Sequence, residues 1–233
     1  QPASFCGIVG LKPTYGRVSR WGLIAYASSF DQIGPFAHSV EDAALLMEII
    51  SGKDSYDSTA SSEKIPAYSN KLNFDKIARI AIFPSTLKSD GLNTEVKSAH
   101  ENIISDMKKD GHTVDEIEFD LLEYLISTYY VLTTAEASSN LARFDGVHFG
   151  YRSKNANEME TVYKRSRTEG FGKEVKNRIV LGTFVLSSGY YDAYYSRAQK
   201  VRRILTDKIR AIFKEYDFIL MPTSPTVAFK LGE

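Results

Sequence analysis

Residues 79–119, RIAIFPSTLKSDGLNTEVKSAHENIISDMKKDGHTVDEIEF, contain the pattern that decides the fold class. The run RIAIF (79–83) is typical of a strand, and Pro84 ends it. Apolar residues then recur at helical spacing between 96 and 107. TVDEIEF (113–119) alternates like a strand with one face in water. Strand, helix and strand in this order predict a βαβ-type unit and a mainly parallel sheet.

The other expected elements follow from the same two periodicities. We expect further helices at residues 39–51, 121–143, 173–186 and 190–214. The last expected strand is the apolar run FILM (218–221), which is typical of a strand buried on both faces. The segments 53–73 and 144–172 lack regular spacing and are predicted to be loops, the first of them on the surface. Together these elements predict an α/β fold.

The composition is that of an ordinary globular protein. The 233 residues suit one large domain or two small ones, and 43% of them are hydrophobic. Lys+Arg and Asp+Glu number 29 each, so no basic surplus points to a stand-alone nucleic-acid binder. The basic residues between 200 and 210 are interpreted as the solvated face of a helix. No apolar stretch approaches the roughly 18 residues of a membrane span, and we expect no membrane contact.

The single cysteine, Cys6, indicates a reducing compartment, because it cannot form an internal disulfide. It lies in the apolar run SFCGIVG (4–10), so we expect a buried packing thiol rather than a nucleophile. We therefore expect a cytoplasmic protein.

The residues alone predict no catalytic machinery. The chain has no GxSxG, CxxC, HExxH or GxxxxGK motif. The serine pairs at 28–29 and 187–188 are interpreted as turn and helix serines, because a hydroxyl without a positioned base is a poor nucleophile. The four histidines are scattered, and we expect them at the surface or as capping residues: His38, His100, His112 and His148.

Several segments resemble the amidase signature family. The resemblance is carried by residues 1–46, QPASFCGIVGLKPTYGRVSRWGLIAYASSFDQIGPFAHSVEDAALL, of which DQIGP and VEDAALL are typical of the whole superfamily. The segments AEASSNLARFDGV (135–147) and RIVLGTFVLSSGYYDAYY (178–195) are more specific, and are similar to the glutamine-hydrolysing subunit of tRNA-dependent amidotransferases. The resemblance implies an amidase-signature fold, with a mixed, largely parallel sheet flanked by helices and here incomplete.

The resemblance also implies where the catalytic groups belong. Family members use a serine nucleophile, a second serine in a cis peptide and a lysine, and all three match positions ahead of Gln1. We therefore expect a fragment of a single amidase domain that lacks the catalytic triad and is itself inactive. Its expected parts are a core segment (1–52), a surface loop (53–73) and the remaining α/β portion (74–233).

Two substrate-binding residues are implied by the resemblance. Arg178 matches the arginine that holds the α-carboxylate of glutamine, and a guanidinium pairs well with a carboxylate. Tyr129 matches a tyrosine of the same pocket, although Tyr130 is the match under a one-residue slip. The polar residues Glu136 and Asn140, like Asp145 after them, are interpreted as structural.

The expected partners follow from the resemblance as well. They are L-glutamine, the other subunits of a heterotrimeric amidotransferase, and tRNA indirectly through a partner subunit, the product being Gln-tRNA or Asn-tRNA. We expect no cofactor on this chain, since ATP and Mg²⁺ are used on the partner subunit. Two alternatives remain open: an amidase of the same superfamily acting on small neutral amides, and a non-catalytic scaffold that docks a partner.

Overall fold

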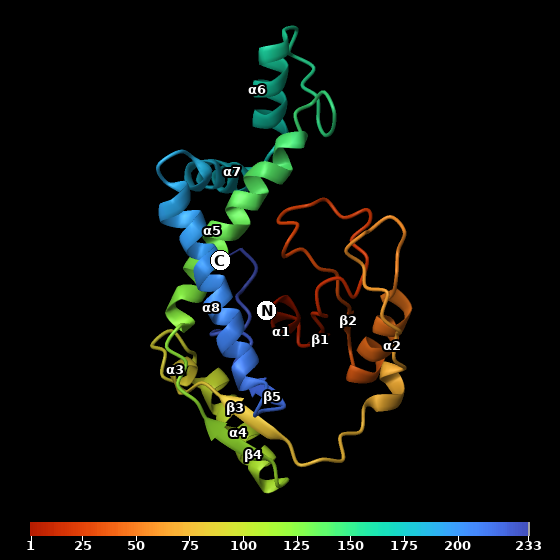
Figure 1. Ribbon diagram of the computed structural model, residues 1–233, viewed down its shortest axis with the longest axis vertical. Coiled ribbons are helices and arrows are strands. Elements are labelled where there is room, and N and C mark those ends of the chain that lie inside the picture. The colour runs from red at the N-terminus through yellow and green to blue at the C-terminus, as the bar shows by residue number, and fades with distance from the viewer. Residues whose placement is uncertain (233) are drawn as a thin grey trace. The chain divides into compact units, whose positions relative to one another are not determined.

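The computed structural model describes residues 1–232, and residue 233 lies outside the described part. The chain divides into two compact units (Figure 1). The first unit contains Gln1–Trp21, Gln32–Asp120 and Asp207–Glu233, and the second contains Gly22–Asp31 and Leu121–Thr206.

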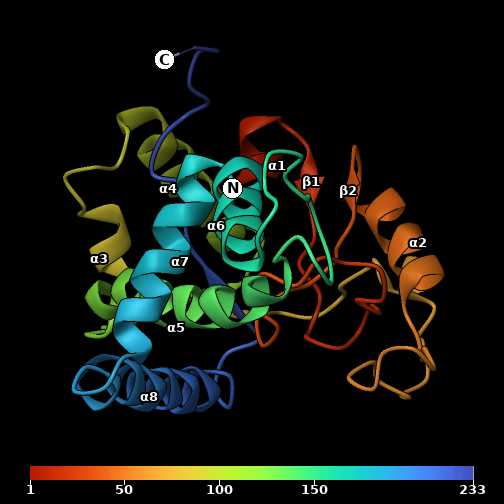
Figure 2. The same ribbon diagram turned by 90° about the horizontal axis from the view of Figure 1, so that it is seen from above.

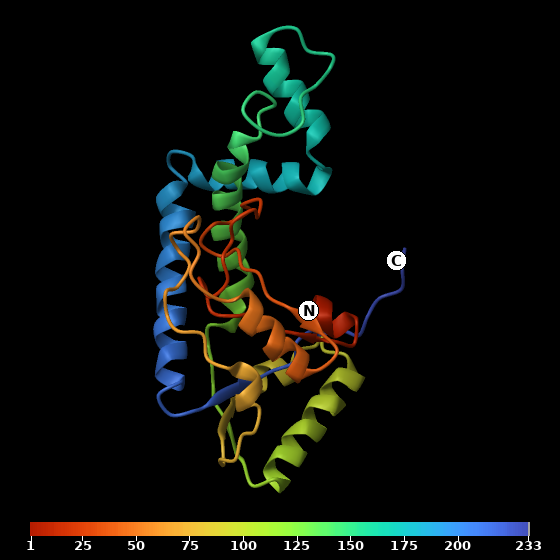
Figure 3. The same ribbon diagram turned by 90° about the vertical axis from the view of Figure 1, so that its right-hand side faces the viewer.

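A three-stranded parallel sheet organises the first unit. Its order is β4 (Thr113–Glu116), β3 (Arg79–Ile82), β5 (Phe218–Leu220), and both outer strands run parallel to the central one. Helix α4 (Thr94–Lys109) carries the chain from β3 to β4, as Figure 3 shows with α4 in yellow-green. The predicted βαβ unit and parallel sheet are therefore confirmed.

The central strand β3 supplies the core of this unit. Ile80, Ala81 and Ile82 are each at most 5% exposed. The ring of Phe83 stacks on that of Phe119, with 5.0 Å between their centroids. Apolar residues on both faces of a central strand are what a sheet covered on both sides requires.

Strand β5 does not fit the prediction of a strand buried on both faces, which is wrong. Phe218 is 46% exposed, and Ile219 and Leu220 are only half-buried. The reason is position: among the described strands β5 pairs with β3 alone, on one side. An apolar run of this length does not distinguish a central strand from an outer one.

His100 corrects a second expectation, because it is not a surface residue. It lies on α4, is 5% exposed, and its Nε2 has no hydrogen-bond partner among the described residues. Burial lowers the pKa of its imidazole, since desolvation disfavours the charged ring. A lone histidine on the inner face of an amphipathic helix is here a neutral core residue.

The opening segment forms a small antiparallel pair. Strand β1 (Val9–Gly10) pairs with β2 (Phe36–Ala37), and helix α2 (Val40–Ile50) follows. The Ser39 side chain caps α2 by accepting a hydrogen bond from the Asp42 N–H at 3.1 Å, as the serine before an apolar run predicts. The short elements of this unit are α1 (Pro2–Phe5), α3 (Pro84–Leu87) and the 3₁₀ turn η1 (Tyr68–Lys71).

The expectation of a buried thiol at Cys6 is wrong. Cys6 is exposed and unpaired. It sits at the end of the single-turn helix α1, in which only Ala3 is buried. One helical turn buries one face, and the apolar composition of the run did not say which residue occupies it.

The second unit is helical. Its elements are α5 (Leu122–Asn140), the 3₁₀ turn η2 (Leu141–Arg143), α6 (Met159–Gly170), α7 (Lys173–Leu186), the π-helical turn η3 (Tyr191–Ser196) and α8 (Arg197–Ile212), whose last residues belong to the first unit. The helices predicted at 121–143, 173–186 and 190–214 are confirmed, the last with a π-helical first turn.

Helix α6 was not predicted and replaces the second half of the loop expected at 144–172. Its first turn is closed by reciprocal hydrogen bonds between Glu158 and Thr161. The capping box normally has serine or threonine first and glutamate third, so the reversed order here gave no recognisable signal.

Close packing of α5 against α7 fixes the geometry of this unit (Figure 2). A Cβ placed on Gly182 of α7 would lie 1.9 Å from the backbone oxygen of Thr134 in α5. Only glycine therefore permits this approach. Thr134 is fully buried, and its Oγ1 donates back to the Tyr130 carbonyl at 2.6 Å.

Candidate functional site

Arg178 lies at the centre of the candidate site, on helix α7. Its Nε donates to Glu174 Oε1 at 2.9 Å, one turn earlier on the same helix. Its Nη1 donates to the Tyr26 hydroxyl at 2.8 Å. The side chain of Arg178 is 28% exposed, so the guanidinium is held by protein groups while part of it remains open to solvent.

Two aromatic rings accompany the guanidinium. The carbon Cζ of Arg178 lies 5.6 Å from the ring centroid of Tyr26 and 5.7 Å from that of Tyr130. Both distances are within the range of cation–π attraction. The site therefore combines one cationic group with flat apolar surface.

Electrostatics keep Arg178 charged. The hydrogen bond to the Tyr26 hydroxyl raises the pKa of Arg178 above its usual value, and the hydrogen bond to Glu174 adds to this. A guanidinium is in any case protonated throughout the physiological range. Such a group suits an anionic ligand, and a carboxylate fits its planar arrangement of donors.

Tyr129 and Tyr130 are neighbours on α5 but have different surroundings. Tyr130 faces the Arg178 guanidinium. Tyr129 contacts Phe30 edge-to-face, with 6.4 Å between ring centroids, and Tyr130 at 5.5 Å. Both rings are nearly half-exposed. The structure thus brings Tyr130 to Arg178 and places Tyr129 one ring further away, while the role of either in substrate binding stays a prediction.

Sequence reasoning missed two of the groups that hold Arg178. Glu174 had a readable signal, since it lies four residues before the arginine and such pairs face each other on a helix. Tyr26 is 152 residues away in sequence, and nothing in the sequence pattern connects it with Arg178.

The three polar residues interpreted as structural do make local contacts. Glu136 accepts from the backbone N–H of Ser29 at 2.9 Å. Asn140 donates to the Tyr26 carbonyl at 3.2 Å. Asp145 accepts from His148 Nδ1 at 2.7 Å and from its backbone N–H, and these bonds lower the pKa of its carboxyl.

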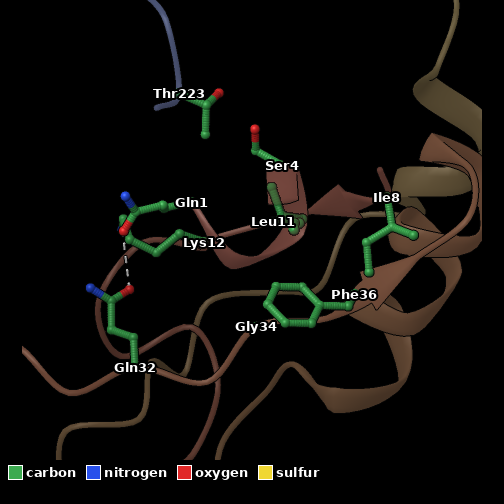
Figure 4. Close-up of a pocket in the computed structure, with 11 residues that line it drawn as sticks. Gln1, Ser4, Ile8, Leu11, Lys12, Gln32, Gly34, Phe36 and Thr223 are labelled. Atoms are coloured by element: carbon green, nitrogen blue, oxygen red, sulfur yellow. Dashed lines mark hydrogen bonds between the residues drawn. The ribbon is translucent and has the colours of Figure 1, made fainter. Parts of the chain in front are cut away.

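A separate hollow of about 570 Å³ lies in the first unit (Figure 4). Lys12 Nζ lines it and donates to the Pro13 carbonyl at 2.8 Å and to Gln32 Oε1 at 3.3 Å. Ser4 also lines it, but within residues 1–232 no base is hydrogen-bonded to its hydroxyl. This hollow has polar groups but no activated nucleophile.

Neither a metal centre nor a membrane span is found in the described part of the chain. Across residues 1–232, no three His, Cys, Asp or Glu side chains are grouped so that they could hold a metal ion. Over the same residues no helix combines the length and apolarity needed to cross a bilayer.

Comparison with known proteins gives consistent results. The family model described as Amidase matches residues 1–233. The chain is 52% identical over 233 residues to the A subunit of the Glutamyl-tRNA(Gln) amidotransferase of Sulfurihydrogenibium sp., covering all of this chain and 48% of the relative. It is also 52% identical over 234 residues to the protein of the same name from Clostridium botulinum, again covering 48% of it.

Solved structures show the same likeness. The A subunit of the Glutamyl-tRNA(Gln) amidotransferase of Thermotoga maritima superposes with a TM-score of 0.73 and 40% identity, covering 100% of this chain and 46% of that one. The chain therefore spans about half the length of the curated relatives it matches. The likeness confirms the predicted α/β amidase-signature fold with its parallel sheet and flanking helices.

Proposed function

Because this chain belongs to the amidase family, we propose that the whole protein containing it is the glutamine-hydrolysing subunit of a tRNA-dependent amidotransferase. The curated relatives with this name are 52% identical to it. Residues 1–233 supply substrate recognition through Arg178, and the residues that break the amide bond lie outside them.

The observation that supports glutamine as substrate is the arrangement around Arg178. Its guanidinium is oriented by Tyr26 and lies near the ring of Tyr130. A carboxylate would accept hydrogen bonds from the guanidinium, and each such charge-assisted bond contributes roughly 1.5–3 kcal/mol. The rings offer apolar surface to a short aliphatic chain. An amino acid with a free α-carboxylate combines these features.

In the proposed reaction the side-chain amide of glutamine undergoes acyl transfer. The hydroxyl oxygen of a serine outside 1–233 attacks the amide carbon, the C–N bond breaks, and the nitrogen leaves as ammonia after taking up a proton. Water then hydrolyses the glutamyl ester to release glutamate and the free serine. The residues of this chain bind and orient the substrate, so that the amide carbon is held within reach of the nucleophile.

The remaining steps belong to the complex. The misacylated tRNA is activated with ATP and Mg²⁺ on a partner subunit, which receives the ammonia, so that Gln-tRNA or Asn-tRNA is formed. This chain needs no phosphate-binding site of its own, which agrees with its equal numbers of acidic and basic residues.

The two alternatives fit the site less well. An amidase for small neutral amides has no use for a charged arginine held with donors open to solvent. A non-catalytic scaffold does not need an arginine fixed between a tyrosine of a loop and a glutamate of its own helix. The Arg178 arrangement therefore favours the glutamine-hydrolysing subunit.

The test is ammonia release from L-glutamine. We expect release by the whole protein assembled with its partner subunits, and none by residues 1–233 alone, with circular dichroism showing whether that shorter chain is folded. Turnover by residues 1–233 would mean that the nucleophile lies within them. An inactive whole complex would contradict the proposed function.

A further inference from the structure

We propose that Tyr26 is a positioning residue that fixes the direction of the Arg178 guanidinium toward the ligand carboxylate, an inference that rests on the proposed function. The Tyr26 hydroxyl accepts a hydrogen bond from Arg178 Nη1 at 2.8 Å. It is the only described group outside α7 that is hydrogen-bonded to this guanidinium within residues 1–232.

The backbone of Tyr26 is held on both sides. Its N–H donates to Asp31 Oδ2 at 2.9 Å, and its carbonyl accepts from Asn140 Nδ2 at 3.2 Å. The next N–H, that of Ala27, also donates to the Asp31 carboxylate at 3.1 Å, and Ala27 is fully buried. The phenol is thus mounted on a turn whose polar groups are used and whose next side chain is packed.

Helix α5 fastens the same turn a second time. Glu136 accepts hydrogen bonds from the backbone N–H of Ser29, at 2.9 Å, and from the Ser29 hydroxyl. Glu136 and Asn140 are one helical turn apart, so one face of α5 holds both ends of the segment that carries Tyr26. Since α5 also packs closely on α7 at Gly182, the turn and the arginine are attached to the same pair of helices.

This arrangement matters because arginine is a flexible side chain. Ordering a long side chain on ligand binding costs conformational entropy, on the order of 1–2 kcal/mol. A fixed hydrogen-bond acceptor orders it before the ligand arrives. Glu174 cannot do this equally well, because its side chain is 70% exposed and itself mobile in rotamer space.

Enough donors remain for a ligand. A guanidinium has five N–H donors. One is used by Glu174 and one by Tyr26, and within residues 1–232 no group is hydrogen-bonded to Nη2. Tyr26 therefore orients the guanidinium without using the donors that a carboxylate needs.

The test is Tyr26→Phe in the whole protein with its partner subunits, a change that removes one oxygen and keeps the ring. We expect the KM for L-glutamine to rise about tenfold, as loss of one hydrogen bond to a charged group predicts, with kcat within about twofold. Turnover of 4-aminobutanamide, which is glutamine without its α-carboxylate, should not change. The control is Tyr151→Phe, which removes a hydroxyl bonded to Glu169 at 2.9 Å, and should leave both substrates unaffected.

A double-mutant cycle with Arg178→Ala distinguishes positioning from general damage. If Tyr26 acts through Arg178, Tyr26→Phe changes the KM for glutamine in the wild type but not in the Arg178→Ala background. An equal effect in both backgrounds, or an equal loss on 4-aminobutanamide, would overturn the proposal.

The same cycle measured by the unfolding midpoint needs no substrate and keeps the two proposals separable. A wild-type complex that releases no ammonia from glutamine would contradict the proposed function alone. The Tyr26–Arg178 contact is then judged by unfolding: the double variant should unfold at the midpoint of Arg178→Ala, whereas fully additive losses would overturn the contact.

Discussion

Glu174 is the residue whose charge most directly opposes a ligand carboxylate. Its Oε1 lies 2.9 Å from Arg178 Nε, and its side chain is 70% exposed. An exposed pair of this kind contributes less than about 1 kcal/mol, so a ligand can displace it. The pair nevertheless competes with the ligand for the same cation.

We therefore expect Glu174→Gln to lower the KM for L-glutamine by about two- to threefold, because the carboxylate no longer competes. The matched control is Glu160→Gln in α6, which breaks a similar exposed pair with Lys164. That control should leave the KM unchanged. A rise in KM for Glu174→Gln would show instead that Glu174 helps to hold Arg178 in place.

Asp57 gives a pH-dependent prediction in the first unit. The hydrogen bond from the Thr59 hydroxyl and those from the N–H groups of Arg20 and Thr59 lower the pKa of Asp57 to about 2. An unfolded aspartate has a pKa of about 3.9, so the stabilisation is complete above roughly pH 4 and is lost as the pH falls toward 2.

We expect Asp57→Asn to destabilise the protein at neutral pH and to remove part of the pH dependence below pH 4. Urea midpoints measured between pH 5 and pH 3 would show a shallower decline for the variant than for the wild type. Equal slopes would mean that Asp57 titrates alike in the folded and unfolded chains.

The contact between α5 and α7 is the decisive one at the level of elements. A methyl group on Gly182 would meet the Thr134 backbone oxygen at 1.9 Å, so the two helices would have to separate. Overpacking costs about 3 kcal/mol, whereas alanine gains about 1 kcal/mol over glycine in a helix interior. The clash therefore exceeds the gain in helix propensity.

We expect Gly182→Ala to lower the free energy of unfolding by about 2 kcal/mol and to displace Arg178, with a raised KM for L-glutamine. The control is Gly172→Ala at the start of α7, where the φ of −63° suits alanine and a Cβ would meet nothing within 4 Å. It should change stability by less than about 1 kcal/mol. A Gly182→Ala protein as stable as the wild type would contradict the close packing.

The elements with strong periodicity were predictable, and those defined by contacts were not. The βαβ unit followed from alternation and helical spacing within one local stretch (79–119). Helix α6 did not, because its start depends on a reversed capping box at Glu158. The outer position of β5 depends on which strand it pairs with, and the burial of His100 depends on which face α4 packs.

The candidate site shows the same limit. Arg178 was predicted because a resemblance supplied its role, and its pairing with Glu174 could be read from helical spacing. The Tyr26 contact arises from tertiary packing between segments 152 residues apart. No single-sequence pattern carries that information.

At the scale of the whole molecule, the chain spans about half the length of its curated relatives, and its second unit contains the proposed binding residues. Binding and bond breaking are thus assigned to different parts of the whole protein. The catalytic step requires a nucleophile that the motifs of residues 1–233 do not predict, and the ammonia must then reach a partner subunit. The claim that connects these levels is recognition of the glutamine α-carboxylate by Arg178.

The most direct measurement compares kcat/KM for L-glutamine and for 4-aminobutanamide in the whole complex, with wild type, Arg178→Ala and the exposed-arginine control Arg165→Ala. We expect Arg178→Ala to lose about 100-fold on glutamine, as the loss of charge-assisted bonds to a carboxylate implies, and less than about threefold on 4-aminobutanamide. Arg165→Ala should match the wild type on both. Equal losses on the two substrates for Arg178→Ala would show that this arginine does not bind the carboxylate.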